Sequence, residues 1–289
     1  MKKQSVVCIL LMSVLFIFPM LSDAAEKIKV AVSIPPQAYF VEQVGGELVD
    51  VTTILPAGAS PHTYEPTATQ MKSLSVADMY IRIKIEFENA WWDKIVAVNP
   101  RMFVVDSTTG TEFILGSEQS TETQTQGRDP HIWLSPKRVK LQAEAICKGL
   151  IAIDPKHTDT YTVNKDAFLK KLDALDQDIH ALLANVKTRK FMVFHPAWAY
   201  FARDYHLEEI SIEHEGKEPS AAEMTKLMEV AKQQHIRVIF VQPQTSRRSA
   251  ETVAKQIGGR VEILDPIARN WMENMQIVAK TLAATLNEN

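Results

Sequence analysis

The feature that most constrains the fold is one long amphipathic segment near the middle of the chain. Between about His157 and Val186, apolar side chains recur every three or four residues and form one stripe: Phe168, Leu172, Leu175, Ile179, Leu182 and Val186. This is the period of an α-helix, and at ~1.5 Å per residue the helix is about 45 Å long. The stripe spans fewer than three heptads, so a coiled-coil dimer is the weaker interpretation. We expect a stiff helix that packs along its own protein and joins two lobes.

Short apolar runs alternate with amphipathic stretches on both sides of this helix. The runs that precede it are Lys27–Ile34, Val49–Leu55, Met79–Ile83 and Met102–Val105. Those that follow it are Lys190–Phe194, Glu208–Ile212, Arg237–Val241 and Arg260–Leu264. Helices are expected at Gln37–Val44, from Pro136 onward, and at Ala197–Tyr205, Ser220–Gln234, Ser246–Ile257 and Trp271–Leu286. Alternation of this kind predicts two α/β lobes of mostly parallel sheet, flanked by helices and joined by the long helix.

Composition excludes several classes of function. The chain is 46% hydrophobic and 23% charged, which is an ordinary balance for a soluble globular protein. Its net charge of −3 provides no basic footprint for nucleic acid. It contains neither G-x-G-x-x-G nor G-x-x-x-x-G-K-[ST], so the usual signatures of dinucleotide and P-loop nucleotide binding are missing.

The N-terminus predicts export. Two lysines precede an apolar run over residues 6–21, and the small residues Ala24 and Ala25 follow it, which is the pattern of a cleaved signal peptide. A retained membrane anchor is the weaker alternative, because the run contains Pro19 and is shorter than the ~20 residues that a span needs. Cys8 lies too early in the run to suggest a lipid anchor. The predicted organisation is a signal peptide at 1–24, an N-terminal lobe at 25–155, the connecting helix at 156–187 and a C-terminal lobe at 188–289.

Cysteine usage shows what must hold the exported protein together. After cleavage only Cys147 remains, so an internal disulfide is impossible and the fold depends on its core. Its neighbours are apolar and helix-forming, and we therefore expect a buried thiol on a helix.

Three of the eight histidines lie next to a proline, just beyond a predicted strand or at the start of a helix. They are His62, His131 and His195, in the strings PHTYEP, DPHIW and FHPAW. Asp265 ends the last predicted strand in the string LDP. Ligands of open α/β sheets bind beyond the carboxyl ends of the strands. Three imidazoles and one carboxylate are a set of four ligands that suits Zn²⁺.

These strings, together with IE at 212–213, GKEPS at 216–220 and LDP at 264–266, resemble one known family. It is the family of metal-binding periplasmic solute-binding proteins of ABC transporters, in the branch that captures zinc and manganese. The resemblance covers essentially the whole mature chain. It implies two α/β lobes, similar to Rossmann folds, that are joined by one rigid helix and hold the metal in the cleft between them.

The resemblance implies that the metal ligands are His62, His131, His195 and Asp265. Manganese-type members have a carboxylate at the third of these positions and zinc-type members have a histidine. His195 therefore favours Zn(II) as the transported ligand, and imidazole also suits Zn²⁺ better than the harder Mn²⁺. The implied partners are an inner-membrane ABC permease and its cytoplasmic ATPase, and the implied form is a periplasmic monomer.

Three departures from the family pattern bear on this expectation. The polar segment Ser117–Gly127 stands where many zinc-type relatives have a histidine-rich loop, and it contains no histidine. The family's glycine-containing turn after the third strand is here Ile83-Lys84-Ile85-Glu86-Phe87, so that turn is expected to differ. Some relatives use an acidic ligand next to the first histidine; here that neighbour is Pro61, which favours Asp265 as the fourth ligand.

Alternative functions predict different sites. The same fold could deliver Mn(II) or Fe(II). A secreted zinc hydrolase would need an open coordination position and a general base, for which Glu65 or Glu215 could be nominated. However, H-E-x-x-H does not occur, and four protein ligands would close the site. A metal-independent adhesin would keep its full function without the histidines.

Overall fold

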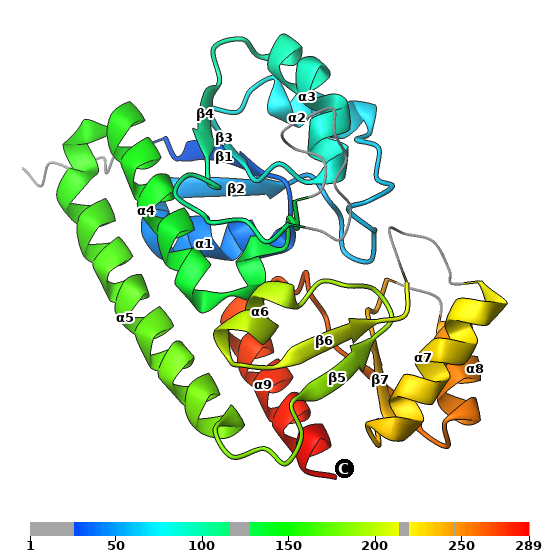
Figure 1. Ribbon diagram of the computed structural model, residues 1–289. Coiled ribbons are helices and arrows are strands. Elements are labelled where there is room, and N and C mark those ends of the chain that lie inside the picture. The colour runs from blue at the N-terminus through cyan, green and yellow to red at the C-terminus, as the bar shows by residue number, and fades with distance from the viewer. Residues whose placement is uncertain (1–25, 116–127, 214–219, 245–246, 289) are drawn as a thin grey trace, which may run out of the picture.

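The computed structural model describes residues 26–115, 128–213, 220–244 and 247–288. The predicted signal peptide and the polar segment at 117–127 lie outside the described residues. Within the described part, no helix has the length and apolar character needed to cross a bilayer. Two α/β lobes lie one above the other, and a long helix runs beside both of them (Figure 1).

Each lobe contains a four-stranded parallel sheet, and the two sheets have the same topology, β2-β1-β3-β4 and β6-β5-β7-β8. The strands of the first sheet are β1 (Ile28–Val32), β2 (Val49–Thr53), β3 (Met79–Arg82) and β4 (Phe103–Asp106). Those of the second sheet are β5 (Lys190–Val193), β6 (Glu208–Ser211), β7 (Val238–Val241) and β8 (Arg260–Ile263). The sequence prediction of two mostly parallel α/β lobes is confirmed.

Helices connect the strands and cover the sheets. The N-terminal lobe has α1 (Pro35–Gly45), α2 (Ala68–Leu74), α3 (Glu86–Val98) and α4 (Pro136–Ile153). The C-terminal lobe has α6 (Ala199–Asp204), α7 (Ala221–Gln233), α8 (Arg247–Gln256) and α9 (Trp271–Glu288). The start of α4 follows from local chemistry, because the Ser135 hydroxyl accepts a hydrogen bond from the Arg138 amide and Pro136 occupies the first turn. Cys147 lies buried on this helix, as expected.

The long segment forms one continuous helix, α5 (Thr158–Leu183), of 26 residues or about 39 Å. It packs against α4 at one end and against α9 at the other (Figure 1). Phe168, Leu172 and Leu175 are buried as the stripe predicted. The prediction that Leu182 belongs to the buried stripe was wrong. Leu182 is 40% exposed, and Leu183 takes the buried position one residue later. The reason is geometric, since a repeat of 3.5 drifts away from the 3.6 residues per turn of a straight helix.

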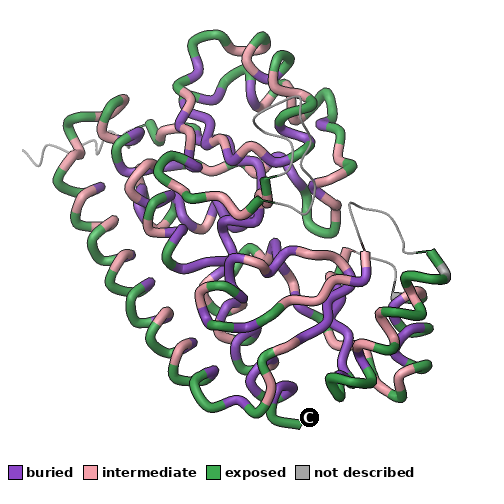
Figure 2. Tube along the Cα trace, viewed as in Figure 1, coloured by how far each residue is buried: buried purple, intermediate pink, exposed green. Residues whose placement is uncertain are grey.

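One hydrophobic core extends through most of the molecule. It contains the N-terminal sheet, the inner faces of α4 and α5, the inner face of α9 and one face of the C-terminal sheet. A second, smaller cluster fills the space between the other face of that sheet and the helices α7 and α8. Figure 2 shows buried segments inside both lobes, and one cluster of buried side chains includes residues of both. The lobes therefore share packing and are not two separate cores joined only by a helix.

Tryptophans connect the lobes at the centre of this shared core. The indole Nε1 of Trp133 donates to the carbonyl of Pro266 at 2.6 Å, and the indole Nε1 of Trp271 donates to the carbonyl of Trp133 at 2.8 Å. Both rings are at most 1% exposed. Such buried indole hydrogen bonds fix the two lobes at a defined separation, because an unpaired buried N–H would cost free energy.

Ion pairs flank this centre on two sides. Arg138 Nη1 of α4 lies 2.9 Å from the carboxylate of Asp204 at the end of α6, and both side chains are nearly buried. Arg269, just before α9, pairs with Glu42 of α1, but both of these side chains are about half exposed. The boundary between the lobes therefore has one buried charged contact and one solvated charged contact.

The turn between β3 and α3 contains a residue other than glycine in a left-handed conformation. Lys84 has φ = 64°, the left-handed region that glycine adopts most easily. The buried carboxylate of Glu88 holds this turn by accepting the amides of Ile83 and Lys84. The Lys84 ammonium also pairs with Asp106 at 2.6 Å. A buried acid and an ion pair thus stabilise the turn around Lys84.

Candidate metal centre

The three candidate histidines lie at the carboxyl edges of the two sheets, where the alternation of elements predicts a site. His62 lies between β2 and α2, and His131 directly precedes the short helix η2 (Ile132–Leu134). His195 follows β5 in the other lobe. The structure brings the three side chains together: one ring nitrogen of each lies within 4.8 Å of those of the other two. Among the described residues, no other group of three or more histidine, cysteine or acidic side chains meets this criterion.

The rings are close enough to share one ion. Their centroids are 4.5 Å apart for His62 and His195, 5.6 Å for His131 and His195, and 6.0 Å for His62 and His131. Tetrahedral zinc with Zn–N bonds of about 2.0–2.1 Å places its nitrogen ligands about 3.4 Å apart. A small inward movement of the loops would therefore suffice. The buried Nε2 of His195 has no hydrogen-bond partner, as expected of an atom that awaits a ligand.

Each ring is also in contact with a carboxylate through Nδ1. The Nδ1 atom lies 3.2 Å from Glu86 in His62, 2.8 Å from Asp129 in His131 and 3.3 Å from Glu213 in His195. Glu86 is about half exposed and His62 is 28% exposed, whereas the other two pairs are largely buried. Three negative charges thus surround the three rings, which makes the location favourable for a cation.

These contacts shift the proton affinities of the site. Burial acts to lower the pKa of His131, but the charge of Asp129 and its hydrogen bond outweigh burial and raise it. Burial and the positive charges of the other two rings hold the pKa of His195 below its usual value, although Glu213 acts in the opposite direction. Burial acts to raise the pKa of Glu86, but the hydrogen bond and charge of His62 lower it to about 2. The lowered pKa of His195 favours its neutral form, the state in which a histidine binds metal.

A partly buried acid shapes the loop that carries His195. The Oε1 atom of Glu209, on β6, accepts hydrogen bonds from the amides of Ala197 and Trp198 at 3.1 and 2.9 Å. Burial is the main cause that raises the pKa of Glu209, to about 7. This contact fixes the backbone just after His195-Pro196.

Asp265 lies near the same edge of the C-terminal sheet but is not one of the group whose ligand atoms are all within 4.8 Å of one another. Its Oδ1 atom accepts the amide of Ile267 at 3.0 Å and the side-chain amide of Gln244 at 3.3 Å. Its backbone carbonyl accepts a hydrogen bond from Asn274 at 2.7 Å. Both side-chain bonds use Oδ1, which leaves Oδ2 for a further ligand.

Sequence reasoning missed the roles of four acids. Asp129 and Glu213 lie inside the strings that carried the resemblance, and the position of Asp129 two residues before His131 was the available signal. Glu86 and Glu209 gave no such signal, since they lie far from their partners in sequence. Glu65, the nominated base of a hydrolase, is exposed, and Glu215 lies outside the described residues.

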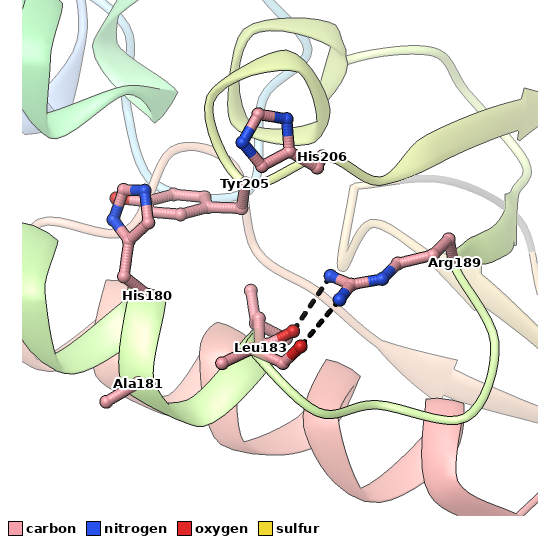
Figure 3. Close-up of a pocket in the computed structure, with 7 residues that line it drawn as sticks. His180, Ala181, Leu183, Arg189, Tyr205 and His206 are labelled. Atoms are coloured by element: carbon pink, nitrogen blue, oxygen red, sulfur yellow. Dashed lines mark hydrogen bonds between the residues drawn. The ribbon is translucent and has the colours of Figure 1, made fainter.

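A surface pocket of about 440 Å³ lies elsewhere, where the C-terminal part of α5 meets α6. Figure 3 shows that Arg189 points back toward the end of α5, where it donates to the carbonyls of Leu183 and Ala184. The Tyr205 hydroxyl donates to Asp176, and His180 is bonded through Nδ1 to the carbonyl of the same residue. These polar groups stabilise the end of α5 and do not form a second metal cluster among the described residues.

Two parallel α/β lobes with a common core, a long connecting helix and three imidazoles between the sheet edges define a class of protein: a metal-binding solute-binding protein. A family model described as zinc-uptake complex component A, periplasmic, matches residues 30–285. The chain belongs to this family, whose members capture zinc for ABC transport. Members are transport components that function with a permease and an ATPase, and they are not enzymes.

Individual relatives agree with this assignment. The chain is 29% identical over 279 residues to a putative metal-binding protein of Chlamydia muridarum, covering 95% of this chain and 99% of the relative. It is 27% identical over 254 residues to the high-affinity zinc uptake system protein ZnuA of Bacillus subtilis, covering 84% and 79%. A crystal structure of a zinc-bound ZnuA deletion mutant superposes with a TM-score of 0.85 at 43% identity, covering 90% of this chain and 98% of that one.

Proposed function

We propose that this protein binds Zn(II) between its lobes through His62, His131 and His195, with Asp265 as the fourth ligand, and delivers it to an ABC permease. The observation that carries the proposal is the convergence of three ring nitrogens from two lobes within 4.8 Å. In addition, the Nε2 atom of His195 is buried without a partner. Three neutral nitrogens and one carboxylate suit Zn²⁺ in both charge and ligand type.

The ligand set is tested by zinc titration of single variants. We expect His131→Ala and His195→Ala each to weaken zinc binding at least 100-fold in a calorimetric competition assay. His157→Ala is the matched control, because His157 also pairs with an aspartate, Asp154, but belongs to the helix-start region far from the group. Affinity near that of the wild type in either site variant would remove that residue from the ligand set.

Asp265 requires its own test, because its carboxylate lies outside the mutual 4.8 Å group. Coordination would use Oδ2 and would leave the bonds of Oδ1 to Ile267 and Gln244 in place. Cobalt(II) in place of zinc reports the donor set through its visible absorption. The proposal predicts a changed spectrum and weaker binding in Asp265→Ala, whereas an unchanged spectrum would indicate water as the fourth ligand.

Metal choice depends on His195 in this proposal. Nitrogen-rich sites favour Zn²⁺ over Mn²⁺ by the Irving–Williams order, and a carboxylate in place of one imidazole would favour the harder ion. We expect His195→Glu to narrow the preference for zinc over manganese, measured as a ratio of two affinities at one pH. An unchanged ratio would show that His195 does not set the choice of metal, and the assignment of zinc would lose its main support. Four protein ligands leave no open position for an attacking water, so zinc hydrolysis is not expected.

The remaining expectations concern the exported form. We propose cleavage after residue 24 or 25 and a monomer whose lobes are 25–155 and 188–289, with 156–187 as connection. The N-terminal sequence and native mass of protein isolated from the periplasm test both points. Because the lobes share one core, release on the permease is proposed to move the loops that carry the ligands and not whole lobes.

A further inference from the structure

The three histidines share a feature that a ligand set does not require: each has a carboxylate at Nδ1. The three acids come from unrelated places in the chain. Asp129 lies two residues before its own histidine, Glu86 begins α3, and Glu213 follows β6. All three rings nevertheless have the same kind of partner at the same nitrogen.

Each of these acids is held by the surrounding fold. The Oδ1 atom of Asp129 also accepts the backbone amide of His131 at 2.8 Å, which places the carboxylate at the ring's Nδ1 edge. The amide of Glu213 donates to the carbonyl of Phe194 at 2.8 Å, which continues the pairing of β5 and β6 up to His195. Glu86 follows the turn that is fixed by Glu88 and Lys84. The acids are thus set in place by backbone geometry before any metal binds.

The chemistry of a neutral imidazole gives these contacts a consequence. It carries one N–H, and the other nitrogen has the free lone pair. A carboxylate at Nδ1 can only accept, so it retains the proton on Nδ1 and leaves the lone pair on Nε2. In His195, Nε2 is buried and has no partner, which agrees with this assignment. The carboxylate also fixes the orientation of the ring and increases its basicity as a ligand.

We propose that Glu86, Asp129 and Glu213 are positioning residues that commit all three histidines to coordination through Nε2. The proposal rests on the proposed zinc site and extends it from the ligands to the residues that orient them. The contribution of each acid to zinc affinity is expected to be larger where the acid is more buried and closer to Nδ1. Asp129 is the shortest contact and is well buried, Glu213 is equally buried but longer, and Glu86 is half exposed. The expected order of effect is therefore Asp129, then Glu213, then Glu86.

The first test measures the ring nitrogens without metal. In apo protein labelled with ¹⁵N-histidine, two-bond ¹H–¹⁵N correlation spectra distinguish a protonated from an unprotonated ring nitrogen. At a pH where the rings are neutral, we expect His62, His131 and His195 to be protonated at Nδ1 and unprotonated at Nε2. Protonation at Nε2 in the wild-type rings would overturn the proposal.

The second test measures zinc affinity in variants. Asp129→Ala, Glu213→Ala and Glu86→Ala are expected to weaken binding about 10–100-fold, in the order given. Asp129→Asn, Glu213→Gln and Glu86→Gln retain an accepting oxygen and should restore part of this loss. Asp154→Asn is the matched control, since Asp154 lies 2.6 Å from Nδ1 of His157 away from the site, and its affinity should equal that of the wild type.

Two outcomes distinguish this proposal from failure of the proposed site itself. If zinc added to the wild type leaves the Nε2 signals of the three rings unchanged, the ligand set is wrong, whatever the tautomers are. A second outcome is that zinc shifts those signals but the alanine variants keep both the wild-type affinity and the Nδ1–H tautomer. In that case the three histidines remain the ligands, and the positioning role of the acids is refuted. Asp129→Ala also removes a backbone hydrogen bond, so Glu213→Ala is the deciding variant should the former fail to fold.

Discussion

The two lobes have the same sheet topology, but their sheets differ in how their two faces are packed. Along β5, Phe191 and Val193 belong to the common core, whereas Met192 and Phe194 belong to the smaller cluster under α7 and α8. The N-terminal sheet has no such division, because its buried residues all belong to the common core. The α7–α8 layer is therefore the one part of the described structure whose packing is separate from the rest.

This difference in packing shows which part of the molecule can open at the lower cost in free energy. Separating the lobes would expose the tryptophan contacts and part of one continuous core, which costs free energy in proportion to the apolar area exposed. Opening the α7–α8 layer would expose only the smaller cluster. Local stability follows the number of buried apolar contacts, so this layer is expected to open first.

The largest predicted effect comes from removing a side chain that serves both lobes. Trp271 of α9 packs edge-on against Phe40 of α1, with ring centroids 5.2 Å apart, and is 1% exposed. We expect Trp271→Ala to lower the free energy of unfolding by about 3–5 kcal/mol, as large buried aromatic truncations do. Urea denaturation of the apo protein measures this loss.

Val253 of α8 provides the comparison in the separate cluster. Val253→Ala should cost about 1–2 kcal/mol and mainly speed amide hydrogen exchange in α7 and α8. If Trp271→Ala likewise changed exchange in only one lobe, the idea of a common core would be wrong.

The next prediction concerns the buried ion pair between the lobes, Arg138 and Asp204. Asp204→Ala would leave the guanidinium of Arg138 nearly buried without its carboxylate, which typically costs about 3 kcal/mol or more. Asp204 also accepts the hydroxyl of Ser135, at the start of α4, so both lobes should lose stability in one transition. Two separate unfolding transitions in this variant would contradict that expectation.

Each lobe also has an acid that holds a turn, fully buried in the N-terminal lobe and partly buried in the C-terminal lobe. Glu88 in the N-terminal lobe and Glu209 in the C-terminal lobe each accept two backbone amides. Burial is the main cause that raises both pKa values, that of Glu209 to about 7. Glu88 also interacts with Ser33, Tyr80 and Arg82, so Glu209 is the cleaner site for a measurement.

The next prediction concerns pH. A carboxyl group whose pKa is raised on folding binds more protons in the native than in the unfolded state, so its contribution to stability is lost as pH rises from about 4.5 to about 7. Glu209→Gln keeps an accepting oxygen but cannot ionise. We expect the variant to gain on the order of 1–2 kcal/mol relative to the wild type between pH 4.5 and pH 8. A difference that stays constant with pH would show that Glu209 is not buried in this way.

The smallest effect is expected at the solvated charged contact between the lobes. Glu42→Ala removes the partner of Arg269, but both side chains are about half exposed, and such pairs contribute below about 1 kcal/mol. Denaturation midpoints of this variant and the wild type should nearly coincide. A loss as large as that of Asp204→Ala would show that exposure is not what distinguishes the two contacts.

The strands of both sheets and the three candidate histidines could be predicted from the sequence. All eight strands lie within two residues of the expected positions, because short β-branched runs bounded by polar turns encode them locally. The three histidines were marked by neighbouring prolines and by their place after strands. The common core could not be predicted, since which face of the C-terminal sheet meets the N-terminal lobe depends on tertiary packing. The acids at 86 and 209 depend on contacts distant in sequence, and no local pattern reports those.

The hydroxyl of Tyr200 has a consequence for how such proteins diversify. Tyr200 of α6 accepts the amide of Ile114 at 3.1 Å and donates to the carbonyl of Asp129 at 2.8 Å. Leu115 and Arg128 also form a bridge, so both ends of the segment between them are anchored side by side. Since the entropy of closing a loop grows only slowly with its length, insertions between these anchors cost little stability. The length and the side chains of the sequence between Leu115 and Arg128 can therefore change in evolution while Asp129 keeps its position beside His131.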